Sequence, residues 1–564
     1  MTSSIKTILL VSLMTCQAAS VLAADIPDSG QLLREVAPAP SLAPKSLPPL
    51  LSQPVEMKPN VSTGAKIKVA GFTYAGNTIL SEKELSALMS GYIGREMTFG
   101  ELDAAAADIT KAYRKKGYFL ASALIPPQTV KPGMPLSIDI VEGTLDRVRI
   151  ETTPAEPRIM KGLLQGFANR IPLGKPADEQ SITSVVMKIN ELPNISSQIR
   201  LEPGTRPGTT QAVLDVKEGR PYGFSLDSDN YGNESTGRYR VGGGVELYSP
   251  LHLGDMFNLR FQESTNGDLE NVQGGYTVPL FPDGTKAGVT YSYLNYTLGG
   301  AFADLNAYGT AQSMNFTLTR PLVRRRNLIL NATLAGERQL LDDINEKDGS
   351  SNKRHTTSLQ AGISGQQMDA FFGGGSTLFS LGVVGGTLVI DNLDALQNDQ
   401  AASGLGTNGG YTKLSMSLSR TQAITGVLSF YGGAYGQWGD KNLTSSEQLS
   451  LGGPSGVRAW QPGDSSGDKG VVATAELRYL FAKAPLIPGS LQASIFVDHG
   501  YAVLHSIPLP NSGDNTRNLT GSGFGVKWFA SSKVTMQATC AWKTAGETIP
   551  TNSPMMYIQA ATHF

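Results

Sequence analysis

The sequence predicts a membrane protein of the all-β class: a transmembrane β-barrel of about 16 strands, preceded by two small α+β domains. From Tyr222 to the C-terminus, apolar and polar residues alternate with a period of two, as in strands that face lipid on one side and water on the other. No run after the leader approaches the ~20 apolar residues of a membrane helix. Between residues 63 and 220, one order of predicted elements, β-α-α-β-β, occurs twice, which indicates a tandem repeat.

Residues 1–24 are predicted to be a cleavable secretory signal. Lys6 is followed by an apolar run from Ile8 to Met14 and by small residues up to Ala24, which is the order of regions in a signal peptide. Cleavage would leave Cys540 as the one remaining cysteine, so we expect no intrachain disulfide, although an exported compartment would permit one. The formal charge of −1 does not indicate nucleic-acid binding.

Residues 25–36 are expected to form a short helix that can plug a pore, with Ser29 as its N-cap and Pro38 ending it. A helix of about nine residues is marginal alone and would be ordered only when docked. The Pro-rich linker at 37–62 could reach roughly 70 Å if extended, which exceeds a ~30 Å hydrocarbon core. A docked plug and a disordered leader both remain open.

Two small domains follow, at 63–143 and 144–220, and their repetition predicts a modular arm. Helix starts and stops are marked by Ser81 and by Gly117. In the first domain we expect a strand around Ile67 to Phe72, helices at 81–90 and 99–116, and strands at 118–124 and 136–141. In the second we expect a strand at 148–151, helices at 156–168 and 178–190, and strands at 199–201 and 212–216.

Residues 221–564 are predicted to form the barrel. Counting alternating segments gives about sixteen, an even number as bacterial barrels require. The connections tend to alternate in length: Pro250 to Gly254 is short, whereas Leu341 to Asn352 and Lys441 to Gly470 are long. Short periplasmic turns and long extracellular loops would produce this alternation. The protein is therefore expected in a bacterial outer membrane, with both α+β domains in the periplasm.

One long loop, within Leu449 to Tyr479, carries a single arginine in the segment Val457-Arg458-Ala459-Trp460. It is rich in Gly, Pro, Ser and Asp and leads into a strand with acidic and basic residues on one face. This combination predicts a loop folded back into a polar cavity and held there by a charge pair. The alternative is a solvated loop charge, worth about 0 to 1 kcal/mol in a surface pair.

Several stretches of the two α+β domains resemble POTRA domains, among them GNTIL (Gly76 to Leu80) and NELPNISSQIRLEPGTRPGTTQAVLDV (Asn190 to Val216). With the leader helix, the linker and a VRxW loop in the barrel, the chain resembles the TpsB transporters of two-partner secretion. These are the ShlB/FhaC/HecB hemolysin secretion/activation proteins. The resemblance covers nearly the whole mature chain and implies two periplasmic POTRA-like domains before a transmembrane barrel.

In that family the loop arginine pairs with the acidic residue of an F-x-D strand motif inside the barrel, and Phe496-Val497-Asp498 matches this motif. The resemblance therefore implies that Arg458 binds Asp498. Alternation independently places Asp498 on the lumen face, but Glu476 has the same phase and is a rival partner. The implied lid-loop motif and loop glycines are Val457, Arg458, Ala459, Trp460, Gly452, Gly453, Gly467 and Gly470.

The chain ends in an alternating strand whose last residue, Phe564, is aromatic. This ending resembles the signal read by the bacterial barrel-assembly machinery. That machinery and the lipid of the outer membrane are therefore expected partners. An ordinary C-terminal strand can produce the same pattern.

Two patterns that suggest enzyme or metal chemistry lack the context they need. Gly463 to Gly467 matches G-x-S-x-G, but a nucleophile elbow has a strand before it and a helix after it, whereas this stretch precedes a strand. Asp227 to Gly232 resembles the start of a calcium loop, but Tyr231 and Arg238 occupy ligand positions. We expect no enzyme activity, no metal site and no cofactor.

These features predict an outer-membrane transporter that recognises and secretes a large β-helical partner protein. The resemblance implies that the POTRA-like domains capture an N-terminal domain of this client by strand addition, and that the client crosses the lumen once the helix and the Arg458 loop move. A barrel-assembly insertase of the same superfamily is the alternative, and a passive pore would conduct without exporting. The identity of the client, its activation and the oligomeric state stay open.

Overall fold

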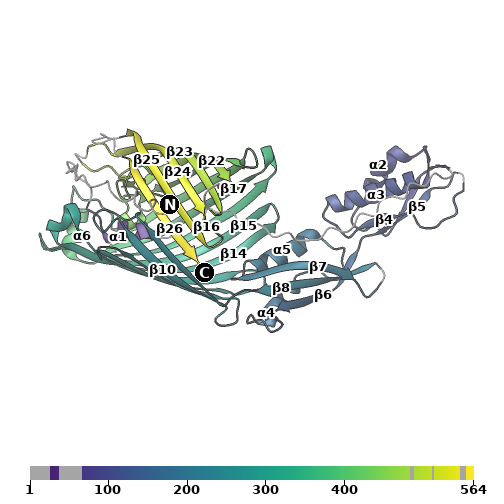
Figure 1. The fold of residues 1–564 in the computed structure, drawn as a ribbon, viewed down its shortest axis with the longest axis horizontal. Helices are drawn as coiled ribbons and strands as arrows, with labels where there is room; N and C mark the ends of the chain where they lie inside the picture. The colour runs from purple at the N-terminus through teal and green to yellow at the C-terminus, as the bar shows by residue number, and fades with distance from the viewer. Residues whose placement is uncertain are drawn as a thin grey trace, which may run out of the picture.

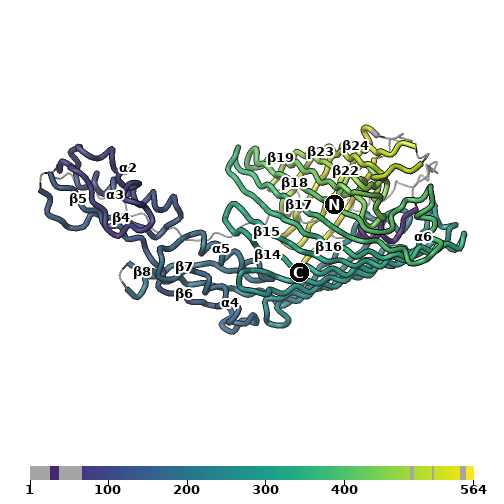
Figure 2. Tube along the Cα trace, turned by 180° about the vertical axis from the view of Figure 1, so that it is seen from behind, coloured from purple at the N-terminus to yellow at the C-terminus, as the bar shows by residue number. Residues whose placement is uncertain are grey.

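The computed structural model describes residues 26–36, 66–131, 133–206, 208–482, 488–510, 513–546 and 554–564. The signal and the linker expected from the sequence lie outside these residues. The molecule is elongated, with a β-barrel that carries an arm of two α+β domains at one end (Figures 1 and 2). We call this end of the barrel the arm end. The opposite, loop end holds the long loops, including α6 (Leu393–Gln400).

Sixteen of the described strands close into one antiparallel barrel, as the alternation predicts. Each strand pairs with its neighbours in the barrel sequence, and the last strand closes on the first, with Gln559 opposite Asp229. The barrel strands are β9 (Tyr222–Asp229), β10 (Arg240–Tyr248), β11 (Met256–Ser264), β12 (Leu269–Pro279), β13 (Lys286–Thr297), β14 (Ala307–Arg325), β15 (Leu328–Asn345), β16 (Ser350–Asp369), β17 (Gly375–Ile390), β18 (Gly409–Ala423), β19 (Leu428–Gly439), β22 (Lys469–Phe481), β23 (Ser490–Val503), β24 (Thr516–Phe529), β25 (Val534–Gly546) and β26 (Met555–His563).

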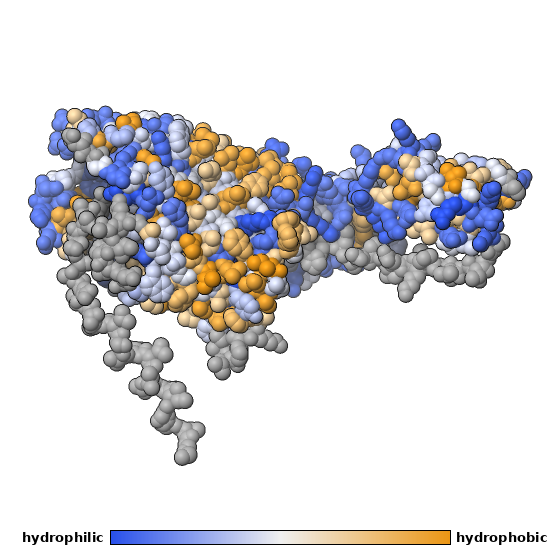
Figure 3. Space-filling model, turned by 90° about the horizontal axis from the view of Figure 1, so that it is seen from above, coloured by the Kyte–Doolittle hydropathy of each residue, from blue (hydrophilic) through white to orange (hydrophobic). Residues whose placement is uncertain are grey.

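The wall of the barrel has an apolar outer face and a polar inner face. On β18, Met416 and Leu418 are each 58% exposed, whereas Ser417 on the opposite phase bonds Ser380 of the neighbouring strand at 2.7 Å. Figure 3 shows apolar residues spread over the barrel wall, with hydrophilic residues gathered toward its loop end. An apolar exterior around a polar interior is the arrangement that suits a barrel in lipid.

One predicted loop is shorter than expected. Leu341 to Asn352 was expected to be a long connection, but β15 continues to Asn345 and β16 begins at Ser350. The ladder persists because every residue from Leu341 to Asn345 has a partner on β16. Strands can pair beyond the apolar belt, so alternation alone does not mark where the membrane ends. Among the described residues, no helix is long and apolar enough to cross a membrane.

The first arm domain packs two helices on a small sheet. Both helices begin with a capping box, at Ser81 and at Thr98, which satisfies the free N–H groups of the first turn. Leu85, Ile109 and Ile138 are 0% exposed in its core. The elements are β1 (Ile67–Lys68), β2 (Phe72–Ala75), α2 (Glu82–Met89), η1 (Ser90–Tyr92), β3 (Glu96–Met97), α3 (Phe99–Lys115), β4 (Ser122–Leu124) and β5 (Leu136–Val141), with sheet order β2-β5-β4 and a separate β1-β3 pair.

The second arm domain repeats this plan: β6 (Thr144–Thr153), α4 (Lys161–Ala168), α5 (Glu179–Asn190), β7 (Ile195–Pro203) and β8 (Thr209–Glu218), with sheet order β6-β8-β7. The first helix begins at Lys161 and not at the expected Glu156. Pro157 interrupts the pattern, and the N–H of Met160 donates to the carbonyl of His252 in the barrel at 2.8 Å. The delayed start of the helix therefore joins the domain to the barrel.

The second domain sits directly on the arm end of the barrel. Arg324 of β14 is 5% exposed and its Nη2 donates to Glu191 Oε2 at 3.1 Å. A Cβ on Gly166 of α4 would lie 2.8 Å from the ring of Pro282, in the turn between β12 and β13. The close contacts of α4 and α5 with the strand ends hold this domain under the mouth of the lumen.

Candidate functional site

The long connection between β19 and β22 folds back into the lumen. Leu451 and Val457 in its middle are both 0% exposed, and they pack against inner-face residues of β22, β23 and β24. At its base, β20 (Leu449–Ser450) pairs with β21 (Ser466–Gly467). We call residues 440–468 the lid loop.

The structure brings Arg458 and Asp498 together inside the barrel. Nε and Nη2 of Arg458 donate to the two oxygens of Asp498 at 2.8 Å each, a bidentate contact that combines charge with fixed geometry. The backbone N–H of Arg458 donates to Asp498 Oδ2 at 3.1 Å, and the hydroxyl of Thr474 donates to Oδ1 at 3.0 Å. Asp498 is 0% exposed, so these bonds replace the water it would otherwise hold.

Glu476, the rival partner, also reaches Arg458. Its Oε2 lies 3.5 Å from Arg458 Nη1, while its Oε1 lies 3.2 Å from Nε of Arg478. The guanidinium carbon of Arg458 lies 3.3 Å from the ring centre of Phe496, which adds a cation–π contact. Asp498 is thus the main partner and Glu476 a second one.

Small wall residues allow the lid loop to approach this closely. A Cβ on Gly521 would lie 2.4 Å from the Cβ of Ala459, and one on Gly500 would lie 3.0 Å from Val457. Real Cβ contacts do not occur at the first of these distances, so a larger residue at Gly521 would push the loop off the wall. These two glycines were not singled out from the sequence, because their role depends on which loop faces them.

Trp460 and the predicted loop glycines shape the rest of the loop. The carbonyl of Trp460 accepts the hydroxyl of Tyr557 at 2.7 Å, and the ammonium of Lys543 lies 3.7 Å from its ring centre. Gly453 has φ +106°, a left-handed conformation that favours glycine. The other three predicted glycines face backbone carbonyls that a Cβ would meet within 2.5 Å: Gly452, Gly467 and Gly470.

Asp468, a buried carboxylate at the end of the lid loop, holds the two ends of the loop together. Asp468 is 0% exposed and accepts the N–H of Leu443 at 3.1 Å, the side-chain amide of Gln448 at 3.0 Å and the N–H of Ser506 at 2.8 Å. It therefore joins the lid loop to the neighbouring loop between β23 and β24.

Helix α1 (Ser29–Val36) also lies in the lumen, against the inner face of β13 to β15. The expectation that Ser29 caps it is wrong. The N-cap is Asp28, whose Oδ1 accepts the N–H of Gln31 at 2.9 Å, while its carbonyl accepts the N–H of Leu32 at 3.0 Å. Leu32 and Leu33 of the helix pack with an apolar patch of the barrel: Leu269, Leu294, Tyr296, Leu298, Ala307, Ala311 and Leu341.

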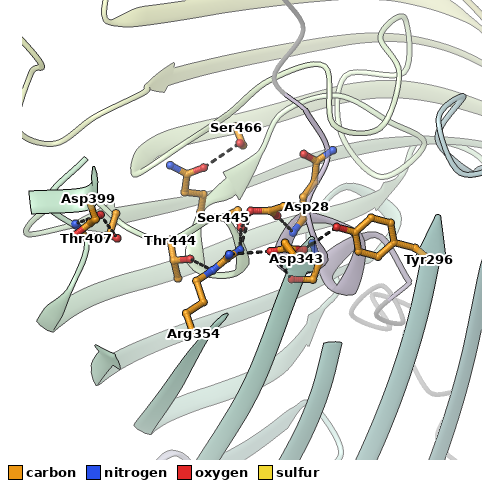
Figure 4. A network of polar contacts seen from close by, with 12 residues as sticks. Asp28, Tyr296, Asp343, Arg354, Asp399, Thr407, Thr444, Ser445 and Ser466 are labelled. Carbon is orange, nitrogen blue, oxygen red and sulfur yellow. Dashed lines mark hydrogen bonds and ion pairs between the residues drawn. The ribbon is translucent and has the colours of Figure 1, made fainter. Parts of the chain in front are cut away.

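Arg354 of β16 anchors the start of this helix (Figure 4). Its Nη2 donates to Asp28 Oδ2 and its Nη1 to Asp343 Oδ2, each at 2.7 Å. The hydroxyl of Tyr296 donates to Asp343 Oδ1 at 2.6 Å, and Arg354 Nε donates to the hydroxyl of Thr444 at 3.2 Å. Arg354 is 4% exposed, and its guanidinium joins helix, wall and lid loop.

The helix and the lid loop contact each other at several points, among them a bond from Arg34 Nη1 to the carbonyl of Gln448 at 2.5 Å. The hydroxyl of Ser445, in η4 (Ser445–Glu447), donates to Asp28 Oδ2 at 2.7 Å, and a Cβ on Gly30 would lie 2.5 Å from that hydroxyl oxygen. Further along, the space beside Gly463 of the lid loop is filled by the side chain of Gln31. Helix and loop therefore form one assembly within the barrel.

With this geometry in view, comparisons with known proteins identify the family. The sequence model of the haemolysin secretion/activation protein ShlB/FhaC/HecB matches residues 208–528, and the POTRA domain of ShlB type matches residues 67–143. The chain belongs to the ShlB/FhaC/HecB family. It is thus an outer-membrane transporter of two-partner secretion, with its POTRA domains in the periplasm and the loop end of its barrel outside the cell.

Individual relatives agree over most of the chain. The heme/hemopexin transporter protein HuxB of Haemophilus influenzae (strain 86-028NP) is 27% identical over 92% of this chain and 91% of its own. The outer membrane transporter CdiB of Escherichia coli O6:K15:H31 is 27% identical over 81% of this chain and 76% of its own. The solved structure of CdiB from Escherichia coli superposes with a TM-score of 0.70 at 22% identity, covering 95% of this chain and 96% of that one.

The last residue of the transporter lies at the seam of the barrel. The N–H of Phe564 donates to the carbonyl of Phe224 on β9 at 2.8 Å, and its side chain is 51% exposed. Its backbone thus continues the closure of β26 on β9.

In the structure, the residues of the G-x-S-x-G pattern and of the calcium-like pattern make other contacts. Ser465 lies in the lid loop and leads into β21, and His499 bonds Thr520 at 2.9 Å on the face of β23 opposite to Asp498. In the calcium-like stretch, Asp227 is bound by Arg260 and Asp229 by Arg240. These carboxylates are already paired with cations of the wall.

Proposed function

We propose that the transporter exports its partner through the lumen, and that α1 and the lid loop together close this passage until the partner is engaged. The observation that carries the proposal is that both segments occupy the lumen and are joined to each other through Asp28 and Ser445. Export of a chain through the barrel then requires both to move. In this proposal, Arg458 with Asp498 and Glu476 holds the lid loop, and Arg354 with Asp343 holds the helix.

The bonds that hold the two segments suit a removable plug. Ion pairs and hydrogen bonds hold both segments, together with the apolar contacts of Leu32, Leu451 and Val457. A cavity of about 280 Å³, lined in part by Asn271, Thr290 and Glu337, continues beside α1. Water can replace the plug as the partner of the polar groups of the wall, so the cost of opening lies mainly in exposing these apolar contacts.

The proposed receptor for the client is the arm. In the second POTRA domain, β6 and β7 are the outer strands of the sheet, so each offers an edge to an added strand. A cavity of about 1090 Å³ runs beside β6 and α4, lined by Arg149, Glu151 and Lys161 among others. Charged residues of both signs along this edge would select a client strand of complementary charge. The client proposed is a large, mostly β-structured protein made as the partner of this transporter.

The first test removes the arm. A variant lacking residues 66–218 should still form a heat-modifiable barrel in the outer membrane but should export none of its partner. Normal export by this variant would refute the receptor role. If one secreted protein alone is lost from the medium, the result supports a transporter for that protein. Loss of many barrels from the outer membrane would favour the insertase alternative.

Two smaller roles are proposed alongside. Phe564 is assigned as the signal for the barrel-assembly machinery, and its exposed ring suits recognition before the seam closes. Truncation of Phe564 should lower the amount of assembled barrel without changing the activity of each barrel that forms.

We assign no enzymatic role to the lid loop, so Ser465→Ala should export at the normal rate.

A further inference from the structure

The turn between β16 and β17, at the periplasmic end of the barrel, presents two phenylalanines to its surroundings. Phe371 is 63% exposed and Phe372 is 78% exposed. Their rings meet edge to face, with centroids 4.5 Å apart. Such a pair forms a compact apolar surface at the tip of the turn, η3 (Phe371–Gly373).

The turn is folded over the outer face of the wall. Gln422 of β18 lies two and four residues beyond Arg420 and Leu418, on the same outward phase. Its side-chain amide donates to the carbonyls of Phe371 at 2.7 Å and Gly374 at 3.0 Å. Because Gln422 points outward, these bonds draw the backbone of the turn toward the lipid side of the barrel and not toward the lumen.

An ion pair on the same outer face fixes the base of the turn. Arg420 Nη1 and Nη2 donate to Asp369 at 2.8 and 2.9 Å, and the remaining donors of Arg420 bond Thr377 and Gln422. The guanidinium is fully used within the protein. It therefore positions the turn and offers nothing to an anionic partner.

The level of the turn coincides with the edge of the apolar wall. The cross-strand neighbour of Gln422 is Phe430 on β19, which is 41% exposed, and the next is Leu477 on β22, which is 37% exposed. These outward side chains belong to the apolar outer face of the wall. The phenylalanine pair is thus beside lipid-facing residues, at the depth where aromatic girdles of barrels lie.

The backbone at the tip adopts a conformation that its residue type disfavours. Phe372 has φ +43° and ψ +46°, a left-handed conformation that bulky residues rarely adopt. Gly373 and Gly374 continue the turn with φ +93° and +104°. A glycine or asparagine would fit position 372 with less strain, so the phenylalanine there indicates a use for its ring.

We infer that the β16–β17 turn is an interfacial anchor, whose Phe371 and Phe372 rings insert among the phospholipids of the periplasmic leaflet. Aromatic rings favour the boundary between headgroups and acyl chains. Gln422 and Arg420 hold the turn in this orientation before lipid is met, so little conformational freedom is lost on insertion. The anchor lies beside the β14–β15 turn, since the N–H of Met368 donates to the carbonyl of Asn327 at 2.8 Å, and would steady the periplasmic mouth next to the strand ends that carry the arm.

The test is a depth measurement in a bilayer. In a Cys540→Ser background, a nitroxide is attached at Phe372→Cys, and the protein is placed in nanodiscs of phosphatidylethanolamine and phosphatidylglycerol. Collision rates with oxygen, which partitions into lipid, and with a water-soluble nickel chelate are compared with those of two reference labels. Met416→Cys reports the lipid-facing wall and Lys83→Cys reports a water-exposed helix of the arm.

We expect the label at 372 to collide at least threefold more often with oxygen, relative to nickel, than the label at 83. A ratio equal to that at 83 would overturn the inference and make the turn a water-facing surface for a soluble partner. Adding Gln422→Ala should shift the label at 372 toward the aqueous value and increase its mobility, while the label at 416 stays unchanged. An unchanged depth at 372 would refute the positioning role of Gln422.

Discussion

The interior of the second POTRA domain and the interior of the barrel are filled in opposite ways. The POTRA core is apolar throughout, with Leu164, Phe167 and Val186 at 0% exposure. The lumen is filled by α1 and the lid loop, which add buried ion pairs of Arg458 and Arg354 to their apolar contacts with the wall. Both fillings are dense, yet they have different consequences when disturbed.

This difference distinguishes the arm domain, which stays folded, from α1 and the lid loop, which have to leave the lumen in the proposed mechanism. An apolar core loses its stabilisation when it opens to water, because hydrophobic burial is its main source. The ion pairs and hydrogen bonds in the lumen can be exchanged for bonds to water, and their net contribution is modest as long as no charge is left buried and unpaired. The arm is therefore suited to remain folded through each transport event, and the lumen filling is suited to leave.

The largest effect is expected from a cavity in the arm. Phe167→Ala should destabilise the second POTRA domain by about 3 to 5 kcal/mol and abolish secretion, with the barrel still heat-modifiable. Hydrogen exchange of α4 and α5 in the intact protein measures the loss. Gln180→Ala, at an exposed position of α5, is the matched control and should behave as the native protein. Unchanged exchange in Phe167→Ala would show that the arm is not held by its apolar core.

The next effect concerns the lid loop. Asp498→Asn leaves Arg458 in a buried site with a weakened partner, and breaking such a pair costs roughly 3 to 5 kcal/mol. The remaining contact with Glu476 places the expected cost toward the lower end. Conductance of single channels in planar bilayers should show more frequent openings, and cysteines placed in the lid loop should become reactive.

The control for this experiment is Asp394→Asn, the same substitution on the exposed helix α6. It should conduct as the native channel does. If Asp498→Asn also stayed closed, the charge pair would not be what holds the loop. Combining Asp498→Asn with Arg458→Gln should cost less than the sum of the two, because the partners act through one contact.

A smaller effect is expected at the helix. Arg354→Gln removes the cation shared by Asp28 and Asp343, and because the side chain of Asp28 is 31% exposed, solvent reduces the expected cost to about 1 to 2 kcal/mol. A spin label on α1 should become mobile while cysteines in the lid loop stay protected. Arg325→Gln, at the exposed arm end of β14, is the control. Release of both segments together would show that they move as a single unit.

The smallest effect lies in the first POTRA domain, where a single carboxylate is buried. Burial alone would raise the pKa of Glu142, but hydrogen bonds from the side chain and N–H of Thr78, the N–H of Ile79 and the hydroxyl of Tyr113 outweigh it and lower this pKa. A lowered carboxyl pKa means that the stabilisation is complete above the ordinary value and is lost as the pH falls through the lowered one.

Glu142→Gln should therefore cost about 1 kcal/mol at pH 7 and make the exchange protection of α3 less dependent on pH in the acid range. Glu96→Gln, an exposed position in the same domain, should leave both the protection and its pH dependence unchanged. A native pH profile in Glu142→Gln would rule out this carboxylate as the source.

Alternation along the chain was enough to predict the barrel, its number of strands and the lumen phase of Asp498, because the side chains of a strand point to opposite faces whatever it pairs with. Spacing and turn residues likewise predicted the two helices and the following strands of each arm domain, but not the separate β1–β3 pair of the first, whose β3 lies between the helices. The pairing of Arg458 with Asp498 was expected through family resemblance, since no local pattern joins residues on different strands. The late start of α4 was missed because it depends on His252, which is distant in sequence. The short connection after β15 was missed because Leu341 to Asn345 continue the ladder with the next strand, β16, beyond the apolar pattern.

The sequence by itself determined which faces of the strands are wet and which are apolar, since that information is carried by adjacent residues. Tertiary structure alone decided that Arg354 meets Asp28 and Asp343, that Gly521 makes room for Ala459, and that Gln422 turns Phe371 and Phe372 outward. Each of these is a contact between segments whose separation along the chain says nothing about their distance in space. Pairing of neighbouring strands, and the folding of α1 and the lid loop into the lumen, bring them together.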